Sequence, residues 1–306
     1  MIMKNRILVG TRGSQLALAQ TNQVIEELRR AVPTLKCEVV PIRTRGDKMH
    51  ELGVSVEGKS IFTREIEEAL IQGRVDIAVH SMKDLPVDPS TSTTIAAIPK
   101  RGNPHDVLIS RERRKFSQLL PRARVGTSSP RRKSQLLAAR GDLEIVDIHG
   151  NVDTRLRKLA NSTYDAIVVA AAGLERLHLD SNATEILSTN LILPAVGQGA
   201  LAVQSREGDE EIMELIIRID HSITRNEIEA ERAFAKRLGA NCRTPIAAYA
   251  RSDSSKLTIE GMVASRDGRM LVRGRVSSNN PNSSQIGAEL AKSLLDKGAS
   301  VLLEGL

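Results

Sequence analysis

Aromatic residues and cysteine are both scarce in this chain of 306 residues. It has no Trp, two Tyr and three Phe, so it lacks the stacking platforms by which proteins usually grip single-stranded nucleic acid. Its two cysteines, Cys37 and Cys242, lie far apart in the sequence, which argues against a disulfide framework and favours a reducing compartment. The composition therefore disfavours both a nucleic-acid binder and a disulfide-rich secreted domain.

Long apolar runs are also missing. No stretch of about 18 apolar residues occurs, so we expect no membrane-spanning helix. The opening MIMKNRILVG leads straight into a strand-like run, without the apolar region of a signal peptide. We therefore expect a cytoplasmic protein that has no membrane partner.

Positive charge is in excess, with a net charge of +7 at pH 7. This charge attracts anions without specifying which anion. The arginines stand beside Gly, Ser and Thr turns and not in long basic runs, a pattern that suits small carboxylates or phosphates in a cleft. Hydrophobic residues make up 41% and charged residues 26%, which is ordinary for a globular enzyme, and the length favours two or three domains.

Strand-like and helical runs alternate through about the first 200 residues, which indicates α/β units with mostly parallel sheets. The openings VGTRGSQLALA at 9–19 and VGTSSPRRKSQLLAA at 125–139 resemble each other, as do VDIAV at 75–79 and YDAIVV at 164–169. We interpret this as two domains of related architecture, each with a strand–VGT–helix corner that can bind anions. In the second corner we expect Ser129 to cap the helix and Pro130 to be its first residue.

From about residue 222 the pattern changes to a helix, three strand-like runs separated by short turns, and a final helix. This order predicts a small α+β domain with an antiparallel meander. The Gly- and Pro-rich segments 99–106 and 193–201 are expected hinges. We therefore place domain 1 at 1–99 with 200–218, domain 2 at 105–193 and domain 3 at 222–306.

Candidate anion-binding residues lie at three predicted helix starts, where free N–H groups and the helix dipole favour negative charge. A single arginine is most often a solvated surface residue, but the adjacent Arg131 and Arg132 directly after SSP favour binding. The candidates at the three starts are Thr11, Arg12 and Ser14; Thr127, Ser128, Ser129, Arg131 and Arg132; and Arg155.

Lys83 and Asp84 follow the predicted strand at 75–79, where open α/β sheets place their ligands. The alternative is an ordinary ion pair in a loop. Cys242 lies on a Gly-bearing loop beside Arg243, which favours an accessible thiolate, whereas a lone Cys is more often a small buried hydrophobe. We expect Cys37 to belong to the core. The sequence contains no zinc-site pattern, Walker A loop or dinucleotide fingerprint.

Seven stretches, in order and spacing, resemble the porphobilinogen deaminase family along nearly the whole chain. They are TRGSQLALAQ, HSMKDLP, VGTSSPRRKSQL, GNVDTRL, AAAGLERL, LPAVGQGAL and AERAFAKRLGANCRTPIAAYA. The resemblance implies two α/β domains like the lobes of type 2 periplasmic binding proteins, with the active cleft between them, and a small α+β domain. It also implies a transferase of porphyrin biosynthesis that condenses four porphobilinogens head to tail, releases ammonia and yields the linear tetrapyrrole hydroxymethylbilane.

By the same resemblance, Cys242 carries a dipyrromethane cofactor through a thioether and Asp84 is the catalytic carboxylate. Further side chains are implied to hold the cofactor: Lys83, Asp84, Thr127, Ser129, Arg131, Arg132, His149 and Arg155. Others are implied to line the site of the incoming substrate: Arg12, Ser14, Arg176 and Gln198. Porphobilinogen carries an acetate and a propionate, so fixed arginines are suitable counter-charges. We expect a monomer that needs no metal.

The chain departs from the family pattern at several positions. His149 stands where the family usually has Arg, and Glu57-Gly58-Lys59-Ser60 replaces the usual Gly-Gly-Lys-Gly of a loop at 46–60. Pro130 replaces a usual Leu, and Asn241 stands where Gly or Ser is common. The main alternative function is a non-catalytic, two-lobed protein that binds or senses small anions, because a fold does not determine a function.

Overall fold

The computed structural model describes residues 4–51, 63–88, 90–161, 163–239, 244–253, 256–279 and 282–304. The chain forms two compact units. The first contains residues 1–102 and 199–225, and the second contains residues 103–198 and 226–306. Each unit is therefore built from two stretches that are separated in the sequence.

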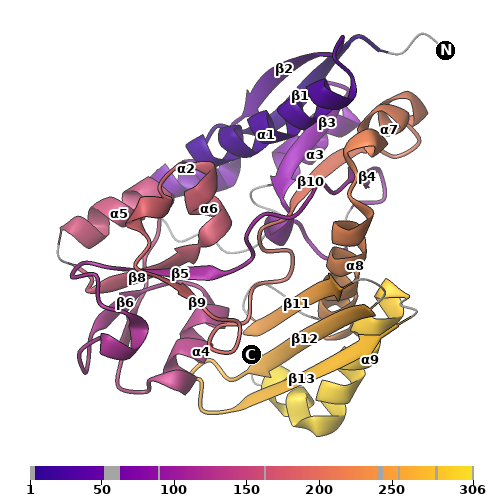
Figure 1. Cartoon of the computed structure of the whole chain (residues 1–306). Helices are drawn as coiled ribbons and strands as arrows, with labels where there is room; N and C mark the ends of the chain where they lie inside the picture. The colour runs from indigo at the N-terminus through magenta and orange to yellow at the C-terminus, as the bar shows by residue number, and fades with distance from the viewer. Residues whose placement is uncertain are drawn as a thin grey trace. The chain divides into compact units, whose positions relative to one another are not determined.

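The first unit is built on a five-stranded sheet with the strand order β2-β1-β3-β10-β4 (Figure 1). The strands are β2 (Lys36–Ile42), β1 (Arg6–Arg12), β3 (Ile77–Ser81), β10 (Leu201–Arg206) and β4 (Thr93–Ala97). β1 pairs in parallel with β2 and β3, whereas β10 runs antiparallel to both β3 and β4. The carboxyl ends of β1 and β3 therefore meet at one edge of the sheet.

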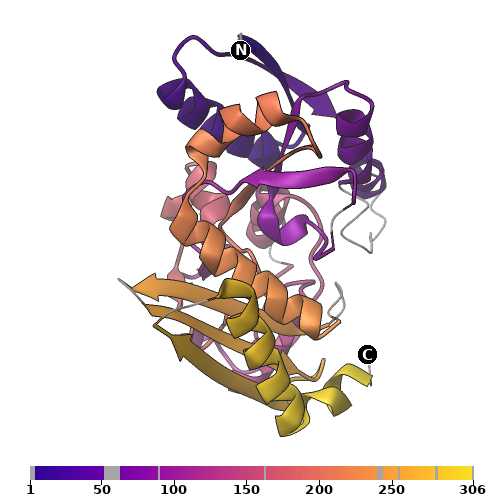
Figure 2. The same cartoon turned by 90° about the vertical axis from the view of Figure 1, so that its right-hand side faces the viewer.

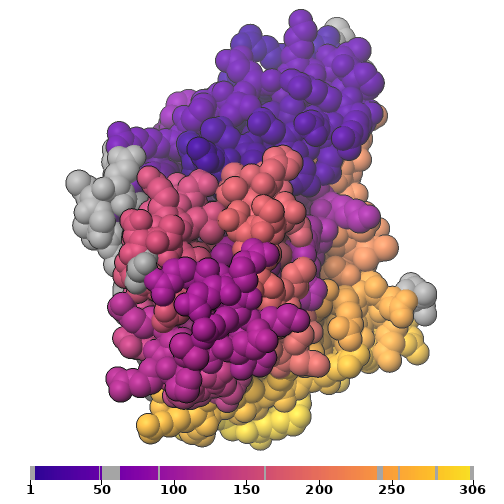
Figure 3. Space-filling view, turned by 60° about the vertical axis from the view of Figure 1, so that its left-hand side comes forward, coloured from indigo at the N-terminus to yellow at the C-terminus, as the bar shows by residue number. Residues whose placement is uncertain are grey.

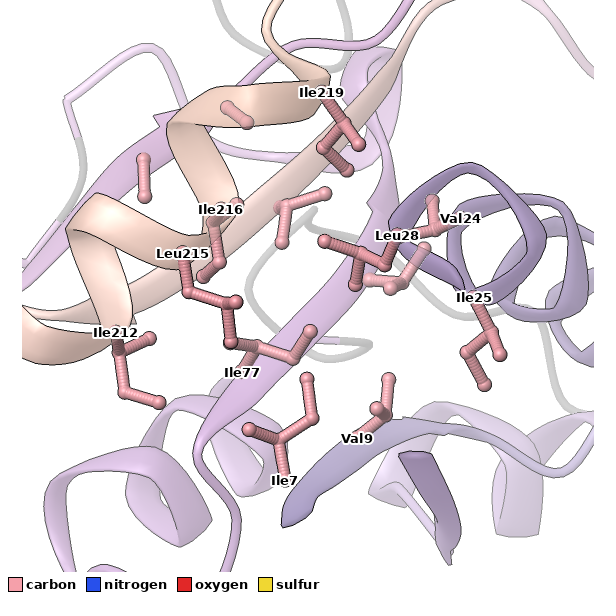
Figure 4. Close-up of a cluster of buried hydrophobic side chains, with 14 of the residues drawn as sticks. Ile7, Val9, Val24, Ile25, Leu28, Ile77, Ile212, Leu215, Ile216 and Ile219 are labelled. Carbon is pink, nitrogen blue, oxygen red and sulfur yellow. The ribbon is translucent and has the colours of Figure 1, made fainter. Parts of the chain in front are cut away.

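Helices cover both faces of this sheet. α1 (Gln15–Ala31) and α7 (Glu210–Ile216) bury their apolar sides on one face, and α3 (Arg64–Ile71) packs on the other. Figure 4 shows side chains from β1, α1, β3 and α7 converging in the first of these cores, among them Ile7, Leu28 and Leu215. Burial of these side chains fixes the start of α1 next to the end of β1.

The second unit repeats this architecture in its sheet β7-β6-β8-β5-β9. The strands are β7 (Glu144–Val146), β6 (Arg124–Gly126), β8 (Ala166–Ala170), β5 (Asp106–Ser110) and β9 (Glu185–Leu187). α4 (Pro130–Ala139) packs on one face, and α5 (Val152–Ala160) and α6 (Ala171–Arg176) pack on the other. The prediction of two related, doubly wound α/β sheets is confirmed.

The expectation of mostly parallel sheets is wrong. β5 runs antiparallel to β8 and β9, just as β10 does to its two neighbours, so each sheet has two parallel and two antiparallel pairings. The cause lies in the connectivity, because β5 and β10 are the strands that follow the first two of the chain's three passages between the units. Their direction is set by that passage and not by a strand–helix–strand repeat.

The C-terminal segment forms the predicted antiparallel meander, with β11 (Ile246–Asp253), β12 (Lys256–Ala264) and β13 (Leu271–Ser278). α8 (Ser222–Arg237) and α9 (Ser283–Leu294) lie on the same face of this sheet (Figure 2). The chain ends with the short helix α10 (Ser300–Glu304). The small α+β part of the fold prediction is thus confirmed.

This segment packs against residues 103–198, so both belong to one unit, and the space-filling view shows their surfaces adjoining (Figure 3). The Arg273 guanidinium donates to the carbonyls of Thr189 and Asn190, and the backbone N–H of Gly197 donates to the carboxylate of Glu231 in α8. The chain passes between the units three times: at 102–103 and 198–199, inside the two Gly- and Pro-rich segments, and at 225–226, within α8. Division into three domains at the boundaries given above stays a prediction.

Candidate active site

The first unit gathers its predicted site residues at the carboxyl ends of β1 and β3. Arg12 ends β1, Ser14 caps α1 by accepting a hydrogen bond from the N–H of Ala17 at 3.3 Å, and Asp84 lies in the 3-10 turn that follows β3. All three line one pocket, whose other polar residues are Gln20, Thr63, His80 and Ser81. The lining does not include Lys83, which is half-buried in the same turn.

Asp84 presents a half-buried carboxylate to this pocket. Within the described parts of the chain, no hydrogen bond or ion pair engages this side chain. Its charge is therefore available to a bound cation or to ligand N–H groups.

Arg12 is engaged by a carboxylate that sequence reasoning missed. Its Nη2 and Nε lie 2.5 and 3.1 Å from Oδ1 of Asp47 in α2 (Arg45–Glu51), and Oδ2 of Asp47 accepts from the hydroxyl of Thr44 at 2.8 Å. Burial alone would raise the pKa of Asp47, but the bonds from Arg12 and Thr44 and the charge of Arg12 outweigh it and lower that pKa. Arg12 thus already binds one carboxylate.

His80 is a second residue that sequence reasoning did not single out. Its side chain is 5% exposed, and burial, with a smaller contribution from the charge of Arg12, lowers its pKa to about 4. It is therefore neutral near pH 7. The sequence could have predicted the burial of His80. Side chains alternate along a strand, and His80 shares with Ala78 the face of β3 that packs under α3.

The second unit forms the VGTSSP corner as predicted. Ser129 caps α4 by accepting from the N–H of Arg132 at 3.4 Å, and Pro130 is the first helical residue. The hydroxyl of Thr127 accepts from the N–H of Ser129 at 3.2 Å and is buried. Ser128 exchanges hydrogen bonds of 2.9 Å with the backbone of Ile148. The hydroxyl groups of this corner therefore bind backbone groups and hold the turn in its conformation.

Arg131 and Arg132 are both 6% exposed and share the carboxylate of Asp106, the first residue of β5. Arg131 Nη1 lies 2.7 Å from Oδ2, while Arg132 Nη2 and Nε lie 2.7 and 3.0 Å from Oδ1. Burial would raise the pKa of Asp106, but the two positive charges win and hold it far below its usual value. Sequence reasoning missed Asp106, although one acidic residue opening the apolar run DVLIS was a usable signal.

Gln198 belongs to the same cluster. Its Nε2 donates to the carbonyl of Pro104 at 2.6 Å and to Oδ1 of Asp106 at 3.1 Å, and its Oε1 accepts from Arg131 at 3.4 Å. With 1% exposure, its amide braces the arginines and does not face solvent. Arg176 is half-buried at the end of α6.

Arg155 adds a third guanidinium to this region. It follows the N-cap Asn151 of α5, and its Nε donates to the carbonyl of Gly150 at 2.9 Å. Burial, together with the nearby charge of Arg132, lowers the pKa of Arg155 to about 10. His149 is half-buried, and its carbonyl accepts from Lys158 at 3.0 Å.

Cys242 lies outside the described residues, as do Asn241 and the loop positions 57–60. Cys37 is half-buried in β2 against the core of the first unit, where burial raises the pKa of its thiol. Among the described residues, no three His, Cys, Asp or Glu side chains are grouped so that they could hold a metal ion. In the same residues, no helix is both long and apolar enough to cross a bilayer.

A family model described as "Porphobilinogen deaminase, dipyromethane cofactor binding domain" matches residues 7–214, and one described as "Porphobilinogen deaminase, C-terminal domain" matches residues 226–296. The chain belongs to the porphobilinogen deaminase family. Proteins named porphobilinogen deaminase from Syntrophus aciditrophicus (strain SB) and Roseiflexus castenholzii (strain DSM 13941 / HLO8) are each 46% identical to it, over 299 and 304 residues. The alignments cover 97% and 99% of this chain and 98% and 100% of those proteins.

Solved structures give a weaker likeness. A probable amino-acid ABC transporter extracellular-binding protein from Bacillus subtilis has a TM-score of 0.44 and 14% identity, with 72% of this chain and 92% of that chain covered. This similarity supports no conclusion about the porphobilinogen deaminase site, which has to be argued from its own residues.

Proposed function

We propose that this protein condenses four porphobilinogen molecules head to tail, releases ammonia and forms the linear tetrapyrrole hydroxymethylbilane. The family relationship over nearly the whole chain supports this transferase activity. One structural observation carries the proposal: among the described residues, the three neighbouring guanidiniums of Arg131, Arg132 and Arg155 share one carboxylate group, that of Asp106, which binds the first two. Like charges in a poorly solvated region repel one another, so this cluster is suited to a ligand rich in carboxylates.

The residues present fit a dipyrromethane cofactor. Arg131 and Arg132 can grip its carboxylates, with Ser129, Thr127, Lys83, His149 and Arg155 as the further groups that the family resemblance assigns to it. When bound through Cys242, the dipyrromethane supplies the pyrrole carbon to which substrate units are added. Bidentate guanidinium–carboxylate geometry would hold that carbon in a fixed position.

Asp84 is proposed as the catalytic carboxylate. Departure of ammonia leaves positive charge on the substrate pyrrole, and a fixed carboxylate stabilises such charge most strongly where water is limited. Asp84 is half-buried and no described residue engages it, so no neighbouring cation already neutralises its charge. It can also accept hydrogen bonds from pyrrole N–H groups.

Arg12 and Ser14, in the same pocket as Asp84, are proposed to bind the substrate's acetate or propionate. In this role a substrate carboxylate replaces or joins Asp47 on the Arg12 guanidinium. Arg176 and Gln198 stay assigned to the substrate's site by the family resemblance. We further propose that the protein is a monomer in the cytoplasm.

Intact-mass measurement of the purified protein tests the proposed function. We expect the mass to exceed the sequence mass by one dipyrromethane, with the adduct on the peptide that contains Cys242. Cys37 is the internal control and should be unmodified. Cys242→Ser should be inactive and less stable, because a bound cofactor stabilises the folded state. An unmodified wild-type protein that is fully active would disprove the cofactor assignment.

A further inference from the structure

The carboxylate of Asp106 is fully buried at the start of β5, where it accepts hydrogen bonds from two arginines and one glutamine. We propose that Asp106 is a positioning residue that orients Arg131 and Arg132 so that their remaining N–H groups face the carboxylates of the bound dipyrromethane. This inference rests on the proposed function and assigns a role to a residue that does not itself touch the ligand.

The donor inventory supports the orientation. A guanidinium has five N–H groups. Arg131 makes three hydrogen bonds, to Asp106, the Leu193 carbonyl and Gln198, and Arg132 makes three, two to Asp106 and one to the Val168 carbonyl. Each guanidinium therefore keeps two N–H groups that donate to no acceptor among the described residues. These are the groups that a ligand carboxylate can use.

The charge balance points the same way. Two arginines and one aspartate leave one net positive charge, and Arg155 nearby adds another. Asp106 reduces the repulsion within the cluster without neutralising it, so the cluster still attracts an anion. Burial lowers the pKa of Arg131, and the charge of Asp106 acts in the opposite direction, which keeps that guanidinium protonated.

Asp106 is itself held firmly. Gln198 bridges its Oδ1 and the carbonyl of Pro104, so the chain segments next to the first two passages between the units are linked at this carboxylate. A buried ion pair is weak evidence for stability, because apolar residues of similar volume often serve as well. A cluster that retains such a pair together with spare donors is better explained by ligand binding.

The test uses the full chain purified from cells and the variant Asp106→Asn. We measure the fraction of molecules that carry the dipyrromethane mass, the kcat and KM for porphobilinogen, and the unfolding temperature. The expected result is at least a threefold fall in the loaded fraction and at least a tenfold fall in kcat of the loaded molecules, with KM changed less than twofold. A matched control is Asp165→Asn in the same unit. The Asp165 side chain is 44% exposed, pairs with Arg111 at 3.5 Å and accepts from the backbone N–H of Arg124 at 2.8 Å, a bond that the asparagine oxygen can keep, so this variant should match the wild type.

A folded Asp106→Asn protein with wild-type loading and wild-type kcat, changed only in its unfolding temperature, would overturn the inference. If Asp106→Asn does not fold, the test uses Asp106→Glu. This variant keeps the negative charge but moves the carboxylate by the length of one methylene. Reduced loading in Asp106→Glu supports positioning, and wild-type loading with wild-type kcat overturns it. A wild-type chain without any adduct would instead refute the proposed function, and this inference with it.

Discussion

Three aspartates beside predicted site residues, two in the first unit and one in the second, occupy three different environments. Asp106 is fully buried between two arginines, Asp47 is held by Arg12 and Thr44, and Asp84 has no partner among the described residues. A carboxylate that is already paired has less to gain from a developing positive charge nearby. Asp84 is therefore the residue whose charge can act on the substrate.

Replacement of Asp84 by Asn keeps the size of the side chain and removes the charge. If the charge stabilises the cation formed as ammonia leaves, kcat should fall by on the order of a hundredfold or more, while KM changes much less. Asp84→Glu should have a milder effect. Steady-state kinetics on protein with a confirmed cofactor mass would measure both. Equal losses in binding and turnover would show that Asp84 acts mainly by binding the substrate and not by stabilising the cation.

The sequence predicted local features of the site and missed its long-range pairs. The cap at Ser129, the helical Pro130 and the place of Asp84 after β3 follow from turn chemistry and strand periodicity, which act over a few residues. Asp106 lies 25 residues from Arg131, and Asp47 lies 35 residues from Arg12. Nothing in a local pattern states which distant carboxylate an arginine will meet, so those pairings required the fold.

At the scale of elements, local patterns also predicted the strands and helices but not the directions of all strands in the sheets. The repeat of strand–VGT–helix segments predicted two related α/β halves, because α1 directly follows β1 in one half and α4 directly follows β6 in the other. The directions of β5 and β10 could not be predicted in this way. They depend on where the chain passes from one unit to the other. A hydrophobic run in the sequence predicts a strand but does not show whether that strand runs parallel or antiparallel to its neighbours.

The C-terminal segment depends on one close helix contact. A Cβ on Gly287 of α9 would collide with the carbonyl oxygen of Ala230 and lie 2.9 Å from the N atom of Phe234, both backbone atoms of α8. Gly287→Ala should therefore lower the free energy of unfolding by about 1–3 kcal/mol, although alanine favours the helix itself. Urea unfolding measures this change. Gly141→Ala, where the nearest atom lies at 3.6 Å, is the control and should cost far less; equal effects would contradict the packing argument.

At the scale of the whole molecule, each unit has one buried titratable group with a strongly lowered pKa, and the two groups respond to acid in different pH ranges. His80 of the first unit has its pKa lowered to about 4, mainly by burial, whereas an unfolded histidine titrates near 6.5. Asp106 of the second unit has a depressed pKa, because its two arginines outweigh burial. The stability that Asp106 contributes is present above the unfolded value near 3.8 and is lost only as the pH falls below it.

The first unit should therefore weaken at a higher pH than the second. Between pH 6.5 and 4 the unfolded chain binds a proton at His80 that the folded chain does not, so the free energy of unfolding must fall as the pH falls. A shift of this size corresponds to on the order of 3 kcal/mol across that window.

Urea unfolding of the wild type and of His80→Gln, from pH 7.5 to 4.5, measures this contribution as the difference in slope against pH. His80→Gln should lose less stability on acidification, even if it is less stable at pH 7.5, because glutamine takes up no proton. His178→Gln, the same substitution at an exposed histidine of the second unit, controls for the general loss of an imidazole. Parallel curves for the wild type and His80→Gln would show that the buried imidazole does not set the acid response of the first unit.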